Sequence, residues 1–228
     1  MYNTKADEHL KRGILPKSTQ IVNPDPTCPD DAMLSAAEAN SGRTEGDMYV
    51  QPFRDIPNVA LIDSKYKWSR STDGNVYVPY TLTGNDKMIE AMRNAFEAYR
   101  QLTCIRFIPR GTQPDYIRMY SGGGCWSEIG QLGGEQLLSL GHGCEYTGTA
   151  IHELMHSLGF KHEQARLDRG RYIEVLFENV LEGMENQFSK ADASRFYDTL
   201  DYDYLSVMHY GEKDFSKNGQ PTLKAIQP

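Results

Sequence analysis

One stretch decides the fold of this 228-residue chain: His152-Glu153-Leu154-Met155-His156-Ser157-Leu158-Gly159-Phe160-Lys161-His162-Glu163. It contains three of the six histidines. His152 and His156 lie four residues apart, so on an α-helix they share one face and are separated by about 6 Å along the axis. Two imidazoles at that separation can bind one zinc ion, each at about 2.0–2.1 Å. The spacing therefore predicts a metal site on a helix.

The other motif residues indicate that this metal site is catalytic. Glu153 points off the face of the two histidines, where it can take a proton from water held by the metal. Gly159 can end the helix and turn the chain back, which lets His162 reach the same ion. Three protein ligands and an open fourth position are typical of a catalytic zinc site. The sequence predicts one catalytic Zn²⁺ bound by His152, His156 and His162, with Glu153 as general base.

A pair of histidines at helical spacing is, by itself, equally compatible with a solvated helix face. Here five identities (His, Glu, His, Gly and His) occur together at set spacing. Chance produces this combination with a probability on the order of 10⁻⁷ per starting position. The metal-site interpretation is therefore favoured.

The longer motif resembles the signature of the metzincins, and Glu163 directly after the third histidine narrows the resemblance to the astacin-like zinc endopeptidases. Residues 206–211, Ser-Val-Met-His-Tyr-Gly, are similar to the methionine turn of that family, with Met208 46 residues after His162. The resemblance implies that Met208 packs beneath the zinc. It also implies that Tyr210 is a fifth ligand, which swings off the metal to stabilise the oxyanion during catalysis.

The resemblance extends from about residue 66 to the end of the chain. Residues 76–80 are similar to an early strand of the family. Cys125, Trp126 and Ser127 begin a segment that looks like its upper edge strand, to which a substrate backbone pairs antiparallel by strand addition. The resemblance also implies a disulfide between Cys125 and Cys144, and substrates that are proteins or peptides.

The predicted fold class is α+β, a two-lobed metzincin-type protease domain. The resemblance implies a twisted mixed sheet with helices above the cleft, and a largely irregular lower lobe that carries the methionine turn. Hydrophobic periodicity predicts an amphipathic helix at 86–102, strands at 105–108 and 116–120, and the motif helix at 149–159. Residues 174–190 are expected to be helical or irregular and to belong to the lower lobe.

The chain is predicted to have two parts, an activation prosegment at 1–57, with a boundary between 54 and 59, and a catalytic domain at 58–228. The first part holds six of the eleven prolines and few apolar runs, which is typical of an extension without a core. A Gly-Asp pair ending in Asp47 is similar to the end of the family's prosegment motif, although Thr44 replaces its phenylalanine. The resemblance implies that Asp47 binds the zinc and keeps the enzyme latent.

Activation is expected through cleavage near residues 54–59. The amino group released there would lie beside Glu163 and form an ion pair that steadies the wall of the active site. Without the resemblance, Asp47 would be an ordinary turn residue and the first part of the chain a flexible extension.

The cysteines favour an oxidising compartment, and hence a secreted or extracellular protein. Cys104 is similar to a family cysteine whose partner lies well beyond the methionine turn, so the catalytic domain is expected to continue past Pro228. A bridge from Cys104 to Cys28 is the alternative. Residues 1–8 are polar and do not resemble a secretory signal, so the signal is expected to have been removed or left out.

Charge and hydropathy argue against two classes of function. The net charge is −7 and no basic patch stands out, which argues against nucleic acid as a partner. No run approaches the roughly 18 apolar residues of a membrane helix. Two other functions stay open: another metzincin protease of different specificity, and a catalytically silent zinc-binding protein of adhesion or matrix assembly.

Overall fold

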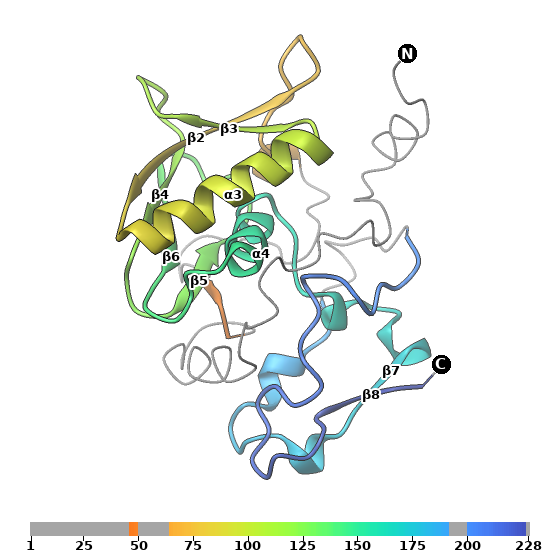
Figure 1. The fold of residues 1–228 in the computed structure, drawn as a ribbon. Helices are drawn as coiled ribbons and strands as arrows, with labels where there is room; N and C mark the ends of the chain where they lie inside the picture. Colours follow the sequence, from red (N-terminus) through yellow and green to blue (C-terminus); the bar gives the residue numbers. More distant parts are fainter. Residues whose placement is uncertain (1–45, 50–63, 192–199, 227–228) are drawn as a thin grey trace.

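The computed structural model describes residues 46–49, 64–191 and 200–226. Figure 1 shows two lobes: an upper one built from a sheet and two α-helices, and a lower one made mostly of loops and short elements. Of the predicted prosegment, only residues 46–49 are described. Its remainder lies outside the described residues, as do Cys28 and the expected cleavage region at 54–59. The division into prosegment and catalytic domain therefore stays a prediction.

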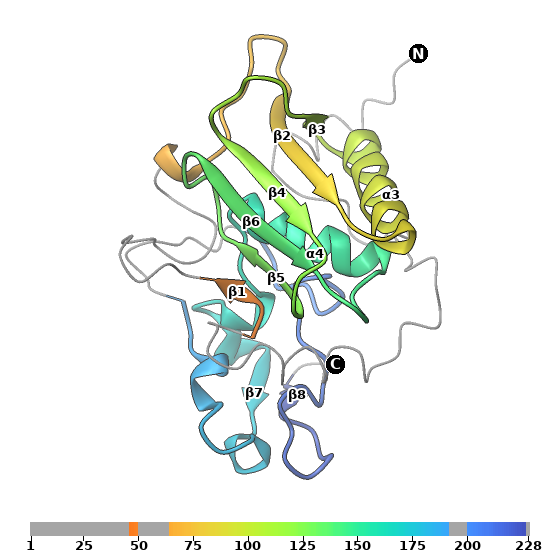
Figure 2. The ribbon, with the colours of Figure 1, turned by 90° about the vertical axis from the view of Figure 1, so that its left-hand side faces the viewer.

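A six-stranded mixed sheet forms the upper lobe, in the order β1-β5-β6-β4-β2-β3. β5 and β6 are antiparallel, whereas the other neighbouring pairs are parallel. Figure 2 shows β1 beside β5 at the lower edge of the sheet. The strands are β1 (Met48–Tyr49), β2 (Val76–Thr83), β3 (Ile105–Pro109), β4 (Tyr116–Tyr120), β5 (Cys125–Glu128) and β6 (Glu135–Leu140).

Helix α3 (Asp86–Leu102) has the bounds that its hydrophobic periodicity predicts. Asn85 caps it, because its side-chain oxygen accepts a hydrogen bond from the Met88 N–H at 2.9 Å. The buried face of α3 joins the main core between the sheet and helix α4. The Tyr99 hydroxyl also donates to the Ile151 carbonyl of α4 at 3.0 Å. α3 thereby holds the motif helix against the upper core.

Helix α4 (Thr147–Ser157) carries the histidine motif and lies on the same side of the sheet as α3 (Figures 1 and 2). It begins and ends two residues before the predicted range of 149–159. At its C-terminal end the cause is local: Leu158 is the cap, and Gly159 has already left helical geometry with a φ of 100°.

The lower lobe is largely irregular, and its core is aromatic. The rings of Phe188, Tyr210 and Phe215 have centroids 5.5–5.9 Å apart. This cluster gives the lobe a core without long helices, and Tyr210 is one of its buried members. The short elements are η2 (Glu163–Ala165), η3 (Arg169–Arg171), β7 (Ile173–Val175), η4 (Phe177–Asn179), η5 (Glu185–Phe188) and β8 (Leu223–Ala225), while η1 (Ser64–Tyr66) precedes the sheet.

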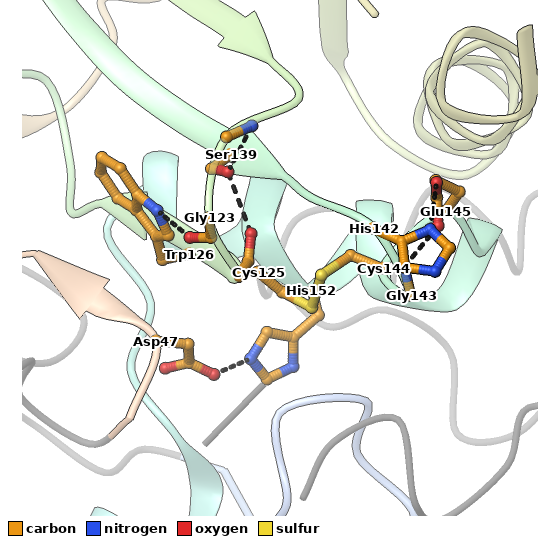
Figure 3. Close-up of a disulfide and its surroundings, with 12 residues drawn as sticks. Asp47, Gly123, Cys125, Trp126, Ser139, His142, Gly143, Cys144, Glu145 and His152 are labelled. Carbon is orange, nitrogen blue, oxygen red and sulfur yellow. Dashed lines mark hydrogen bonds and ion pairs between the residues drawn. A yellow bond between two sulfur atoms is a disulfide. The ribbon is translucent and has the colours of Figure 1, made fainter. Parts of the chain in front are cut away.

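The disulfide between Cys125 and Cys144 is present, with a Cα–Cα distance of 5.6 Å. It joins β5 to the loop that leads into α4 (Figure 3). Cys104 is a free thiol in the described part of the chain, and its Sγ accepts a hydrogen bond from Arg70 at 3.6 Å. Among the described helices, none is both long and apolar enough to cross a bilayer.

Candidate metal centre

Three histidines converge near the C-terminal end of α4. His152 and His156 project from the helix, and His162 reaches the same point from the segment that follows it. The Nε2 atom of His152 lies 3.1 Å from the Nε2 atoms of both His156 and His162. All three side chains are buried. The structure thus brings the three predicted ligands together.

The turn at Gly159 makes this convergence possible. The Gly159 N–H donates to the His156 carbonyl at 2.8 Å, and the Phe160 N–H donates to the Met155 carbonyl at 3.1 Å. This pair of hydrogen bonds is a Schellman motif, which ends a helix with one residue in left-handed conformation. Gly159 supplies that residue, with a φ of 100°. The chain can therefore turn back and direct the third histidine at the first two.

Replacing Gly159 with alanine is expected to lower the free energy of unfolding by about 1–2 kcal/mol and to weaken zinc binding, because a Cβ is strained in left-handed backbone. Urea unfolding followed by circular dichroism, and zinc titration, measure the two effects. Gly123→Ala is the matched control, since Gly123 has no positive φ and no atom lies within 4 Å of the position that its Cβ would take. Equal midpoints for the two variants would contradict the expectation.

Backbone carbonyls set the tautomer of two of the imidazoles. The Nδ1 of His152 lies 2.7 Å from the Val207 carbonyl oxygen, and the Nδ1 of His156 lies 2.7 Å from that of Phe160. A carbonyl only accepts, so each Nδ1 donates its proton and each Nε2 keeps its lone pair. Burial also lowers the pKa of His156 to about 4, which keeps this imidazole neutral near pH 7. Lone pairs that face each other at 3.1 Å repel unless a cation lies among them.

Asp47 adds a carboxylate to the three imidazoles. Its Oδ2 lies 3.1 Å from His152 Nε2 and 3.2 Å from His162 Nε2, and its Oδ1 lies 3.4 Å from His156 Nε2. Figure 3 shows this carboxylate directed at His152. Burial acts to raise the pKa of Asp47, but the coulombic attraction of the facing imidazoles in their protonated form, His162 above all, holds it well below its usual range. An anion therefore lies where the lone pairs meet.

These four side chains fit a tetrahedral zinc ion. Bonds of about 2.0–2.1 Å place the ligand atoms of a tetrahedron about 3.3 Å apart. The measured separations of 3.1–3.4 Å agree with this spacing. One ligand atom from each side chain lies within 4.8 Å of all the others. Imidazole nitrogens and a carboxylate oxygen are also donors that zinc takes, so the group fits in geometry and in chemistry.

Glu153 follows the first ligand on α4 and is 1% exposed. One step along an α-helix turns the side-chain direction by about 100°, so Glu153 leaves the face of His152 and His156. Glu153 therefore points away from the face of the two ligands, and its side chain is buried away from bulk water.

The methionine turn docks onto the ligand segment through backbone groups. The Met208 carbonyl accepts from the Glu163 N–H at 2.9 Å, and the Tyr210 N–H donates to the Gln164 side chain at 3.0 Å. The rings of Tyr210 and His162 lie side by side, with centroids 4.7 Å apart. Met208 is itself buried. The structure thus brings Met208 and Tyr210 to the third histidine.

Three further groups take part in this docking, although no sequence motif assigns them a role. The buried amide of Gln164 holds the backbone of Tyr210. His209 donates from Nδ1 to the Tyr210 carbonyl and accepts at Nε2 from the Tyr202 hydroxyl, both at 2.7 Å. The Val207 carbonyl orients the first metal ligand. No sequence signal identifies that carbonyl, because every residue has one.

Glu163 is tied to two neighbours in the lower lobe. Its Oε1 accepts from the Asp203 N–H at 2.9 Å and from the Arg166 guanidinium at 3.2 Å. Burial raises the pKa of Glu163, while these two contacts act in the opposite direction. The expected ion pair with a released amino group involves residues 54–59, outside the described residues, and stays a prediction.

The predicted substrate strand is covered by the chain's own residues. Cys125, Trp126 and Ser127 lie in β5 and are buried. On the outer side of β5, β1 pairs in parallel, with Met48 opposite Ser127. The Ser127 N–H also donates to the Asp47 carbonyl at 3.0 Å. The parallel direction of β1 is opposite to the antiparallel direction expected of a substrate. The segment therefore covers β5 but runs in the reverse direction to a bound substrate.

Gly46 lets this segment pass close to the lower lobe. Its φ is 78°, and a Cβ on it would lie 2.8 Å from the Cζ atom of Phe215. Any other residue would be strained and would meet that ring. Thr44, which replaces the phenylalanine of the family's prosegment motif, lies outside the described residues.

The family model described as Astacin, a peptidase family, matches residues 61–228. The chain belongs to the astacin family. Among similar proteins is zinc metalloproteinase nas-6 of Caenorhabditis elegans, 37% identical over 205 residues, which cover 87% of this chain and 60% of that protein. Zinc metalloproteinase nas-8 of the same species is 44% identical over 172 residues, 73% of this chain and 41% of that protein. The chain thus spans less than two thirds of either relative.

A solved structure shows the same astacin fold. The high choriolytic enzyme 1, a hatching enzyme zinc-protease from Oryzias latipes (medaka fish), is 36% identical and has a TM-score of 0.68. The match covers 72% of this chain and 84% of that one. The predicted two-lobed α+β fold and the resemblance to the astacin-like proteins are therefore confirmed.

Proposed function

We propose that this astacin-family chain contains the catalytic domain of a zinc-dependent endopeptidase, held latent by the preceding prosegment. The observation that carries the proposal is the meeting of imidazole lone pairs and one carboxylate at tetrahedral spacing. Family membership supports it, because similar proteins are named zinc metalloproteinases. The substrates would be peptide bonds of proteins or peptides.

The reaction follows from the residues around the ion. Zinc bound by the three histidines would act as a Lewis acid that activates water and polarises the peptide carbonyl. Glu153 takes the proton from the attacking water and passes it to the leaving amine. Its burial supports this role, because bulk water is kept away from the transferred proton.

Tyr210 and β5 would act on the substrate itself. The Tyr210 hydroxyl stabilises the oxyanion that forms on the carbonyl oxygen, a role supported by its ring contact with His162. The hydrogen bond from the Tyr210 N–H to Gln164 supports it further, because it anchors the backbone while the side chain moves. β5 binds the substrate backbone by strand addition once β1 has left.

Latency would rest on Asp47 and on β1 together. Asp47 takes the coordination position that the reaction needs, and β1 takes the edge of the sheet to which the substrate must pair. Cleavage near residues 54–59 would release both. The ordered contacts of residues 46–49 with the site support this assignment.

We further propose that the protein works in an oxidising, extracellular compartment. The disulfide between Cys125 and Cys144 supports this, because such bridges persist where thiols are not kept reduced.

The metal requirement can be tested directly. Arg43 and Arg54 flank residues 46–49, so limited trypsin digestion can excise the inhibitory contacts, with excision verified by mass spectrometry. The digested chain is expected to hold one zinc and to cleave a fluorogenic peptide library. Activity should disappear with 1,10-phenanthroline and return with added zinc, because the ion supplies the Lewis acid. Stoichiometric zinc without any turnover would favour the silent zinc-binding alternative, and chelator-resistant turnover would contradict a zinc enzyme.

A further inference from the structure

Met48 is a buried apolar residue next to the metal centre that the mechanism does not use. It is fully buried, at 0% exposure, although it belongs to the segment that must leave on activation. Its partners are Ile129, also at 0% exposure, and the half-buried Leu132. These three residues, here termed the Met48 cluster, are separate from the main cores of both lobes.

The Met48 cluster lies directly beside the site of reaction. Met48 follows Asp47, whose carboxylate contacts the metal-binding histidines. Ile129 follows the last residue of β5, the strand that binds the substrate backbone in the proposed function. The Gly130 N–H then donates to the carbonyl of His156 at 2.9 Å. The cluster therefore adjoins both the metal ligands and the substrate strand.

The walls of this cluster are held by contacts that do not involve Met48. Besides the bond from Gly130 to α4, the Gln131 N–H donates to the Tyr66 carbonyl at 2.8 Å. The Gln136 side chain donates to the Gly130 carbonyl at 2.8 Å. Departure of residues 46–49 would therefore leave the backbone around Ile129 in place and uncover its apolar side chain.

We propose that Ile129 and Leu132 form a substrate subsite that accepts an unbranched apolar side chain, such as methionine, on the N-terminal side of the scissile bond. The chain's own methionine shows which kind of side chain this place accepts. Two uncovered apolar residues gain from burying such a group and lose from burying a charge. The inference rests on the proposed endopeptidase function and on antiparallel substrate pairing.

The direction of the strands sets the side of the bond. β1 runs parallel to β5, so the step along the chain from Asp47 to Met48 points towards the Glu128 end of β5. An antiparallel substrate passes that end first and the metal centre afterwards. The residue that takes the place of Met48 therefore precedes the bond that is cut.

Binding and cleavage are measured separately to test the subsite. For binding, the trypsin-digested, zinc-loaded Glu153→Gln chain is titrated with labelled octapeptides that differ only in Met, Lys or Asp at one position. For cleavage, the digested parent is given the same peptides unlabelled, and mass spectrometry locates the cut. We expect Met to be preferred over Asp by at least about tenfold at one position N-terminal to the cut.

Leu132→Glu should reverse this preference towards Lys, because it places a carboxylate in the subsite. Ile226→Glu is the matched control, since Ile226 is 53% exposed and lies in the lower lobe; it should keep the preference of the parent. An unchanged zinc content shows that each variant is folded at the metal centre.

The outcomes separate the subsite from the enzyme activity. Met-selective binding that Leu132→Glu reverses, without any cleavage by the parent, would support the subsite and contradict the endopeptidase. Cleavage without preference N-terminal to the cut, or a preference that Leu132→Glu leaves unchanged, would contradict the subsite and leave the endopeptidase standing.

Discussion

Replacing Glu153 with glutamine is expected to leave one zinc bound per chain while lowering kcat by about 10²–10⁴-fold. That range is the usual contribution of a general acid–base group. Glutamine keeps the size and polarity of the side chain but cannot take the proton of the attacking water. The side chain is 1% exposed, so an isosteric change is needed to preserve the packing around α4. The measurement is kcat of the trypsin-digested variant on a fluorogenic peptide, with zinc content determined on the same sample.

A matched exchange on an exposed surface shows whether charge loss alone has an effect. Glu90 lies on the exposed part of α3, and Glu90→Gln should retain the kcat of the parent. Turnover of Glu153→Gln within tenfold of the parent would mean that another group acts as the base.

Replacing Asp47 with alanine is expected to raise the activity of the intact, undigested chain by about 10–100-fold. A hydrogen bond or ligand contact of a charged group contributes about 1.5–3 kcal/mol, and each 1.4 kcal/mol corresponds to a tenfold change. The Asp47 carboxylate has three imidazole nitrogens within 3.4 Å, so its loss removes the contacts of the prosegment with the metal-binding histidines, while the pairing of β1 with β5 remains. Casein digestion before and after trypsin treatment measures the effect.

The control for Asp47 is an aspartate that touches no part of the site. Asp73 lies in an exposed turn, where it accepts from Tyr77 and Asn75, and Asp73→Ala should leave the intact chain latent. Both variants should reach the activity of the parent after trypsin digestion. An intact parent that digests casein as fast as the digested chain would show that Asp47 does not confer latency.

The upper lobe could be predicted closely because its signals are local. The helix at 86–102 repeats apolar residues every three or four positions and has Asn85 as its cap, and both signals lie within one segment. The lower lobe carries no such periodicity. Its one pair of described strands joins Ile173 to Ala225, and its core is an aromatic cluster from distant segments. Those partners are set by packing, which a scan along the chain does not show.

The metal site likewise combines local features that the sequence predicts with contacts to residues distant in the sequence. The spacing of His152, His156 and His162 names the ligands, because a helix and a glycine turn fix their relative positions. The orientation of the first imidazole depends on the Val207 carbonyl, 55 residues away. The role of His209 in the methionine turn depends on the Tyr202 hydroxyl. Neither contact could be read from the motif.

What the sequence determined by itself was local: the helix that presents two imidazoles, the glycine that ends it, and the identity of the acidic residue beside them. Regular backbone geometry converts residue spacing directly into position, so these features need no other part of the molecule. The resemblance to the family already implied that Asp47 meets the metal ligands, and the structure shows its contact with His152 across 105 residues. The parallel pairing of β1 with β5 and the burial of Met48 beside Ile129 came from the tertiary structure alone. Those contacts arise because the sheet edge, α4 and the lower lobe pack around one point, and that packing depends on the whole chain.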